Sequence, residues 1–118
     1  MAHHYKTTLD LYERLLFQIE HGSDRVYWDD VHSHVEYYEA DSCPVGPSPQ
    51  NKGRQVGEFD IILVNYEDRN AWYWEVKTSP NHTGYGHDQV ERAKQFFDGD
   101  LSDGSEWSVI GDVYLEPS

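Results

Sequence analysis

The sequence predicts an α/β domain in which helices flank a mixed central sheet. Residues 57–64 and 72–79 are rich in β-branched and aromatic residues, and the polar segment 65–70 separates them, which predicts a β-hairpin. Both faces of this hairpin are mostly apolar, as expected of strands covered on two sides. Apolar residues recur at helical spacing before the hairpin and again after it. These three observations together favour a sheet between helices.

The first helix and the first strand precede the hairpin. Thr7-Thr8-Leu9-Asp10 resembles a capping box and predicts a helix from there to His21, with an apolar stripe formed by Tyr12, Leu15, Leu16 and Ile19. Residues 31–40 alternate as a strand does. Residues 41–55 show neither helical nor strand periodicity and predict a long loop. Loops of this length in a compact domain are usually functional or disordered.

The remaining elements follow the hairpin. Asp88 is a good N-cap, with Glu91 three residues later, and predicts a second helix that ends at Phe97. Residues 98–105 predict a turn, and residues 107–115 predict a last strand. The expected order is α-β-β-β-α-β in a single domain that spans residues 1–118, because a chain of this length has no room for a second core.

The net charge of the chain disfavours nucleic acid as a ligand at low salt and favours a protein that works in concentrated salt. The net charge is −13, with only four lysines and five arginines, whereas nucleic-acid-binding proteins normally present a basic face. In about 1 M salt the Debye length falls to about 3 Å and general repulsion from DNA disappears. The excess of acidic residues along the chain therefore favours a halophilic organism, or a virus of one, as the source.

Cysteine content and hydropathy restrict the compartment. Cys43 is the single cysteine, so an internal disulfide and a multi-cysteine zinc site are both excluded. No apolar run approaches the roughly 18 residues of a membrane span, and the first residues lead directly into a helical pattern rather than a signal peptide. We expect a soluble, cytoplasmic protein with no membrane partner.

The hairpin brings two acidic residues together. If the strands pair symmetrically about the loop, opposed residue numbers sum to 135, and Asp60 lies opposite Glu75. Like charges on directly opposed residues of two strands are unfavourable unless a cation lies between them. Lys77 follows Glu75 by two residues and returns to the same face. Strict alternation assigns the apolar residues to two faces: Ile62, Val64, Ala71 and Tyr73 with the carboxylates, and Phe59, Ile61, Leu63, Trp72, Trp74 and Val76 on the other.

This pattern resembles a known family. Asp60, fourteen intervening residues and then Glu75-Val76-Lys77 resemble the signature of the PD-(D/E)XK nucleases, with Phe59 in place of the leading proline. The resemblance covers residues 8–115 and implies a restriction-endonuclease-like core. It also implies a metal-dependent deoxyribonuclease that hydrolyses phosphodiester bonds. Within the superfamily the chain resembles the archaeal Holliday junction resolvases, and that resemblance implies a structure-selective enzyme that acts as a homodimer.

The expected metal is Mg²⁺, with Mn²⁺ as a substitute. Hard oxygen ligands suit Mg²⁺, and the carboxylates of Asp60 and Glu75 and the backbone carbonyl of Val76 are placed to supply them. Lys77 would orient the attacking water or stabilise the transition state. By resemblance to the resolvases, in which a glutamate of the first helix is followed by arginine, Glu13 in Glu13-Arg14 completes the site.

Other residues are candidates for weaker reasons. Gln89 and Arg92 on the second helix are candidate DNA contacts by resemblance, and Lys52 and Arg54, at the end of the long loop, form a basic pair suited to phosphate. Glu20 and Glu36 stay open as alternatives to Glu13. His32, His34 and Glu36 share one face of a strand and are an alternative transition-metal set.

Two rival functions stay open. A restriction-like or exonuclease enzyme of the same fold would use the same residues, and the sequence does not distinguish it from a junction resolvase. A non-enzymatic acidic module would instead bind a protein partner through its aromatic surface, which nine tyrosines and four tryptophans allow. The complete set of Asp60, Glu75 and Lys77 favours the enzyme.

Overall fold

The computed structural model describes residues 2–22, 27–39, 41, 43–45, 53–97 and 107–116. Its elements follow the predicted order, with one short 3₁₀ turn, η1, added before the second helix. In chain order they are α1 (Ala2–His21), β1 (Asp30–Tyr38), β2 (Gln55–Asn65), β3 (Asn70–Lys77), η1 (Pro80–His82), α2 (Thr83–Phe97) and β4 (Ser108–Leu115).

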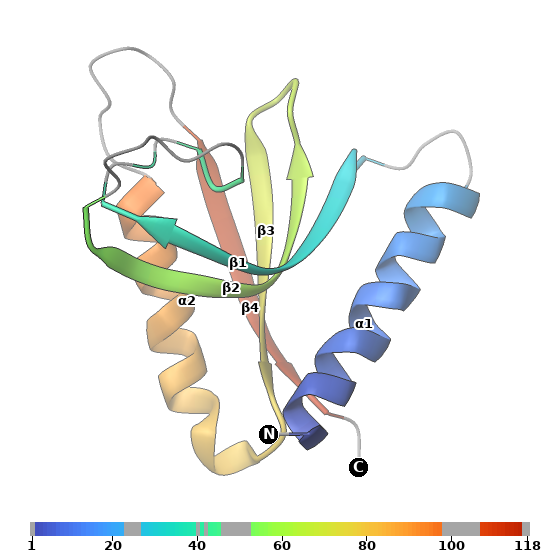
Figure 1. Ribbon diagram of the computed structural model, residues 1–118, viewed down its shortest axis with the longest axis vertical. Helices are drawn as coiled ribbons and strands as arrows, with labels where there is room; N and C mark the ends of the chain where they lie inside the picture. Colours follow the sequence, from blue (N-terminus) through green and yellow to red (C-terminus); the bar gives the residue numbers. More distant parts are fainter. Residues whose placement is uncertain are drawn as a thin grey trace.

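The four strands form one mixed sheet with a helix on each side (Figure 1). The strand order is β1-β2-β3-β4; β1, β2 and β3 are antiparallel neighbours, and β4 runs parallel to β3. A parallel neighbour requires a crossover, and α2 supplies it between β3 and β4. The α/β class and the mixed sheet are thus confirmed.

Two apolar clusters fix the helices to the sheet. On one face the core includes Val90, Ala93 and Phe97 of α2, which pack with Ile62 and Tyr73 of the hairpin. On the other face Leu11 of α1 packs with Val31, Ile61, Leu63 and Val76. The stripe predicted for the first helix, Tyr12, Leu15, Leu16 and Ile19, lies against this second cluster.

The hairpin register is the predicted one. Ile62 pairs with Tyr73 and Val64 with Ala71, so paired numbers sum to 135. The pairing ends at Ile61 and Trp74, one step before Asp60 and Glu75. From there β2 stays paired with β1 and β3 stays paired with β4, and Figure 1 shows the β1–β2 pair curving away from β3.

Both helices begin earlier than predicted. Helix α1 begins at Ala2, and the Thr8 hydroxyl does not cap it but donates a hydrogen bond to the carbonyl of His4 inside the helix, 2.9 Å away. Helix α2 begins at Thr83 and not at Asp88. A Cβ on Gly86 would lie 2.7 Å from Val113 and 3.3 Å from Lys77, so this glycine lets the first turn of α2 pack closely on β3 and β4.

The alternation of faces fails at one point of the β1–β2 pair. Phe59 packs in the α2-side cluster with Ile62, and not with Ile61 as strict alternation predicts. Opposite Asp60, His34 has a φ of 54°, a left-handed conformation that is rare for a residue other than glycine in a strand. This backbone reversal accompanies the curve of the pair and turns Asp60 toward β3.

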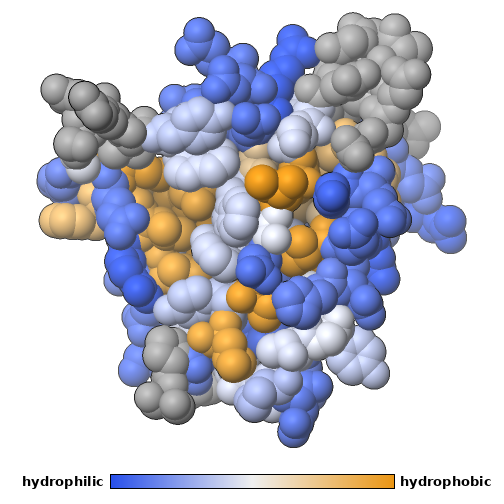
Figure 2. Space-filling model, turned by 180° about the vertical axis from the view of Figure 1, so that it is seen from behind, coloured by the Kyte–Doolittle hydropathy of each residue, from blue (hydrophilic) through white to orange (hydrophobic). Residues whose placement is uncertain are grey.

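The side of the molecule that faces away from the viewer in Figure 1 has an apolar centre and polar edges. Figure 2 shows apolar residues in the middle of that side, between hydrophilic edges. Exposed apolar side chains on β4 include Ile110 and Leu115. Neither of the described helices is long and apolar enough to cross a membrane.

Candidate metal and catalytic site

The candidate site lies where β2 and β3 separate. At this point Val76 of β3 no longer pairs with β2, and side chains rather than a strand bind its backbone N–H and carbonyl. An Asp60 carboxylate oxygen accepts the Val76 N–H at 2.9 Å. His4 of α1 lies with its Nε2 2.9 Å from the Val76 carbonyl and 3.5 Å from the same Asp60 oxygen. The opening between the strands is therefore filled by one carboxylate and one imidazole.

Glu75 is the most buried ionisable group of the site. It is 3% exposed and Asp60 is 9% exposed. Lys77 Nζ lies 3.2 Å from one Glu75 oxygen, whereas the other oxygen is buried without a hydrogen-bond partner. Burial, and then the Asp60 carboxylate, raise the pKa of Glu75 to about 8, and Lys77 opposes the shift. In the absence of a cation, burial and the Asp60 carboxylate therefore favour the protonated form of Glu75.

Lys77 belongs to the site and not to a surface pair with Glu58. Glu58, which the predicted register with paired numbers summing to 135 places opposite Lys77, lies instead 3.2 Å from His34 Nδ1. The Lys77 stem passes close to Gly86 on α2, where it is held between the helix and β3. The structure thus brings Asp60, Glu75 and Lys77 together as the sequence predicts.

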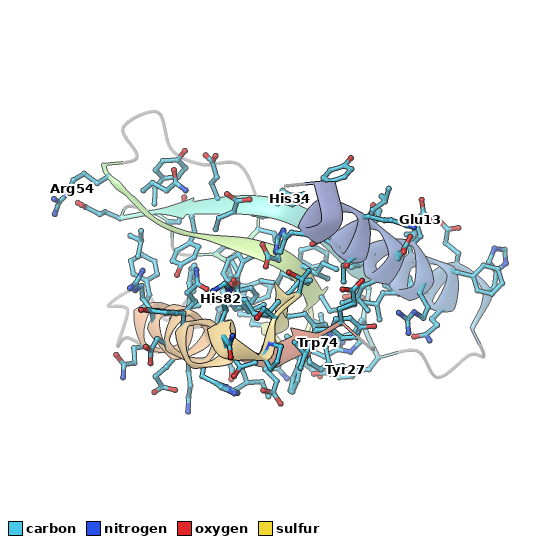
Figure 3. All side chains as sticks on the ribbon, turned by 90° about the horizontal axis from the view of Figure 1, so that it is seen from below. Glu13, Tyr27, His34, Arg54, Trp74 and His82 are labelled. Atoms are coloured by element: carbon cyan, nitrogen blue, oxygen red, sulfur yellow. The ribbon has the colours of Figure 1, made fainter. Side chains whose placement is uncertain are left out.

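The structure does not bring Glu13 to this group. His4 is the residue of α1 that reaches the opening, and Glu13 lies nine residues later, about 14 Å along the helix axis. Its side chain is on the exposed side of α1 (Figure 3). The alternatives also lie elsewhere: Glu20 is beside His21, and Glu36 accepts a hydrogen bond from the Tyr38 hydroxyl.

The predicted histidine set on β1 does not converge. His32 lies near Asp30, at 3.3 Å, while His34 turns to Glu58. Within the part of the chain that the structure describes, no three His, Cys, Asp or Glu side chains are gathered closely enough to hold a metal ion.

The predicted DNA contacts fall into two groups. Gln89 and Arg92 line a groove of about 580 Å³ that Lys77 also lines, so they border the site. Arg54 is at the distant end of β2 (Figure 3), with its guanidinium 2.9 Å from Glu39, and it does not approach the site. Lys52 lies outside the described residues.

The chemistry of the donors fits Mg²⁺ with water as the main ligand. The Glu75 oxygen beside Asp60 is the feature that fits, because a bound cation would satisfy it in place of the proton that burial favours there. Mg²⁺ is commonly held by one or two carboxylates and several waters. The Val76 carbonyl is a third oxygen, although here it is engaged by His4.

The sequence analysis does not select His4, because this residue precedes the helix start that the capping pattern predicts. The signal that could have located it is the continued helical stripe: His4, Thr8 and Leu11 occupy one face of α1.

Comparison of the chain with protein-family models, curated proteins and solved structures found no significant match. The function is therefore inferred from the residues of the site.

Proposed function

We propose that this protein is a metal-dependent deoxyribonuclease of the PD-(D/E)XK type, with a restriction-endonuclease-like core. The observation that supports this most is the buried pair of Asp60 and Glu75 at the separation of β2 and β3, with Lys77 on Glu75 and one carboxylate oxygen unpartnered. Buried carboxylates destabilise a fold unless they are paired. A cation between them would remove that cost.

Each residue has a role that its contacts support. A bound Mg²⁺ or Mn²⁺ would supply charge neutralisation at the phosphoryl group and a more acidic water. Asp60 and Glu75 would hold the ion, and the Val76 N–H fixes the orientation of the Asp60 carboxylate. Lys77, with its stem against Gly86, keeps its ammonium at the mouth of the pair, where it orients the attacking water or stabilises the charged transition state.

The groove beside Lys77 supports DNA as the substrate. Arg92 and Gln89 of α2 and His82 of η1 border it, so cationic and hydrogen-bonding side chains meet next to the carboxylates. Phosphate contacts of this kind position a strand without reading its sequence. Structure-selective cleavage and a homodimer are proposed by resemblance to the archaeal junction resolvases.

Cleavage assays test the proposal. Supercoiled plasmid, a linear duplex and a synthetic four-way junction are incubated with the protein and either Mg²⁺ or EDTA, from low salt to about 1 M KCl. We expect Mg²⁺-dependent cleavage that rises with added salt, because screening weakens repulsion by the net charge of −13. Glu75→Gln should abolish it. Glu67→Gln, at the exposed turn of the same hairpin, is the matched control and should cleave normally.

The pattern of products separates the rival functions. Selective cutting of the junction supports a resolvase, nicking of plasmid supports a restriction-like enzyme, and progressive loss from linear ends supports an exonuclease. Absence of cleavage at every salt and with both metals, in a folded protein, would contradict the nuclease proposal and favour the protein-interaction module.

A further inference from the structure

Tyr85 stands between two hollows at the start of α2. Its side chain is 72% exposed, the largest fraction among the exposed large hydrophobic residues of the described chain. One hollow is the groove beside Lys77, of about 580 Å³, and the other, of about 330 Å³, lies on the side of Asn81 and Gly84. Tyr85 and Asp88 line both, so the tyrosine ring has open space on two sides.

The glycines on each side of Tyr85 have different surroundings. A Cβ on Gly84 would meet no atom within 4 Å outside its chain neighbours, so Gly84 itself faces open space. A Cβ on Gly86 would collide with Val113 and crowd Lys77. Gly86 thus packs the start of α2 closely against β3 and β4 beside the site. Tyr85, one residue earlier, projects into solvent.

The two hollows differ in charge. Asp88 lines both, but the groove on the site's side also has Lys77, His82 and Arg92, which suit a phosphate. The described residues that line the other hollow, Asn81, Gly84, Tyr85 and Asp88, present an amide, a ring and a carboxylate and no positive charge. An amide and a carboxylate suit the hydrogen-bonding edge of a base and disfavour a phosphate.

We propose that Tyr85 stacks an unpaired nucleobase of the DNA next to the scissile phosphate, so that the enzyme selects DNA with an unpaired nucleotide at the cut. This inference rests on the proposed function and names its substrate class. A base inside a continuous duplex is stacked on both neighbours and cannot present a face to Tyr85. A base in a tail, a gap or a branch point can. Base stacking on an aromatic side chain tolerates any base, so no sequence preference is implied.

Binding is tested in EDTA, so that no DNA is cut. Two fluorescently labelled hairpin DNAs of equal length of duplex are compared, one blunt and one with an unpaired tail of three nucleotides that contains 2-aminopurine. We expect the tail to increase the affinity of the wild type by about 5- to 150-fold and the 2-aminopurine emission to be quenched on binding. The titrations are made at 0.1 M and 1 M KCl because of the negative charge of the protein.

Three variants identify the residue responsible. Tyr85→Ala should bind the tailed and blunt DNAs equally and leave the 2-aminopurine unquenched. Tyr85→Phe retains the ring and should behave as the wild type. Tyr66→Ala removes another exposed tyrosine, 48% exposed, at the opposite end of the hairpin, and should also behave as the wild type.

The outcomes separate this inference from the nuclease proposal. Equal affinity of the wild type for both DNAs, or full tail preference in Tyr85→Ala, overturns the inference, even if Mg²⁺ then supports cleavage of both. Tail binding that depends on Tyr85, without cleavage in Mg²⁺ or Mn²⁺, supports the base site and contradicts the nuclease proposal. Failure to bind either DNA at both salts overturns the two together.

Discussion

The two ends of the β2–β3 hairpin are built differently. From Ile61 to Asn65 the strand pairs with β3 through its backbone, and side chains such as Ile62 are fully buried in apolar surroundings. Beyond Ile61 the strands separate, and Asp60 and His4 bind the free backbone of Val76. Both ends are buried, but the paired end buries apolar groups and the separated end buries two carboxylates. The first stabilises the fold, and the second retains an electrostatic cost that a bound cation would relieve.

The largest effect on stability should come from the paired end. Ile62→Ala removes a side chain that is 0% exposed and leaves a cavity, so the free energy of unfolding should fall by about 2–5 kcal/mol. Chemical denaturation followed by tryptophan fluorescence measures it. Ile110→Ala, at a position 47% exposed on β4, is the control and should cost less than about 1 kcal/mol. Equal losses at the two positions would contradict the account of the core.

The separated end should respond to pH. Because the pKa of Glu75 is raised to about 8 in the folded, metal-free protein from its ordinary 4.5, the folded state binds the proton more tightly than the unfolded chain. This contribution is complete below pH 4.5 and is lost as the pH rises to about 8, by up to about 1.4 kcal/mol per pH unit. Denaturation in EDTA measures it. Glu75→Gln should remove this slope, and parallel profiles of wild type and variant would refute it.

Asp60 contributes both a hydrogen bond to Val76 and a negative charge, and two substitutions distinguish the effects of the two. Asparagine retains an oxygen that can accept the Val76 N–H, whereas alanine leaves that buried donor unpaired. We expect Asp60→Ala to be less stable than Asp60→Asn by about 1–3 kcal/mol, while neither cleaves DNA. Denaturation and the plasmid assay measure the two properties. Equal stability of the variants would mean that the hydrogen bond does not close the separated end.

His4 should have the smallest effect. His4→Ala removes a hydrogen bond to the Val76 carbonyl and should cost about 0.5–1.5 kcal/mol of stability in EDTA, without lowering the affinity for Mg²⁺. Calorimetric titration measures that affinity. His87→Ala, on a side chain 62% exposed near Asp112, is the control. A large loss of metal affinity in His4→Ala alone would show that the imidazole is itself a ligand.

The paired end could be predicted from the sequence because it follows short-range rules. Alternating apolar residues on both sides of a polar turn fix the register, and the register in turn places Asp60 and Glu75 one step beyond the last pair, Ile61 with Trp74. The order of elements and the proximity of Lys77 follow from the same periodicity. These properties depend on residues that are near in the chain.

The separated end could not be predicted to the same depth because it depends on contacts between distant segments. The left-handed backbone at His34, the reversal at Phe59 and the approach of His4 arise from the packing of β1 and α1 on β2. Glu13 is a candidate only by resemblance to the resolvases, whereas His4, about 14 Å from it along α1, is the residue that reaches the site. A short motif does not specify how residues of distant elements are placed relative to one another.

Metal binding at the separated end is the central claim, and calorimetric titration of Mn²⁺ into the metal-free protein tests it most directly. The wild type and Glu67→Gln should bind the ion equally, and Asp60→Asn and Glu75→Gln should each lose more than about tenfold in affinity. The bound wild type should also lose the pH slope of its stability between about 4.5 and 8, because the ion displaces the Glu75 proton. Unchanged Mn²⁺ affinity in Glu75→Gln would contradict the account.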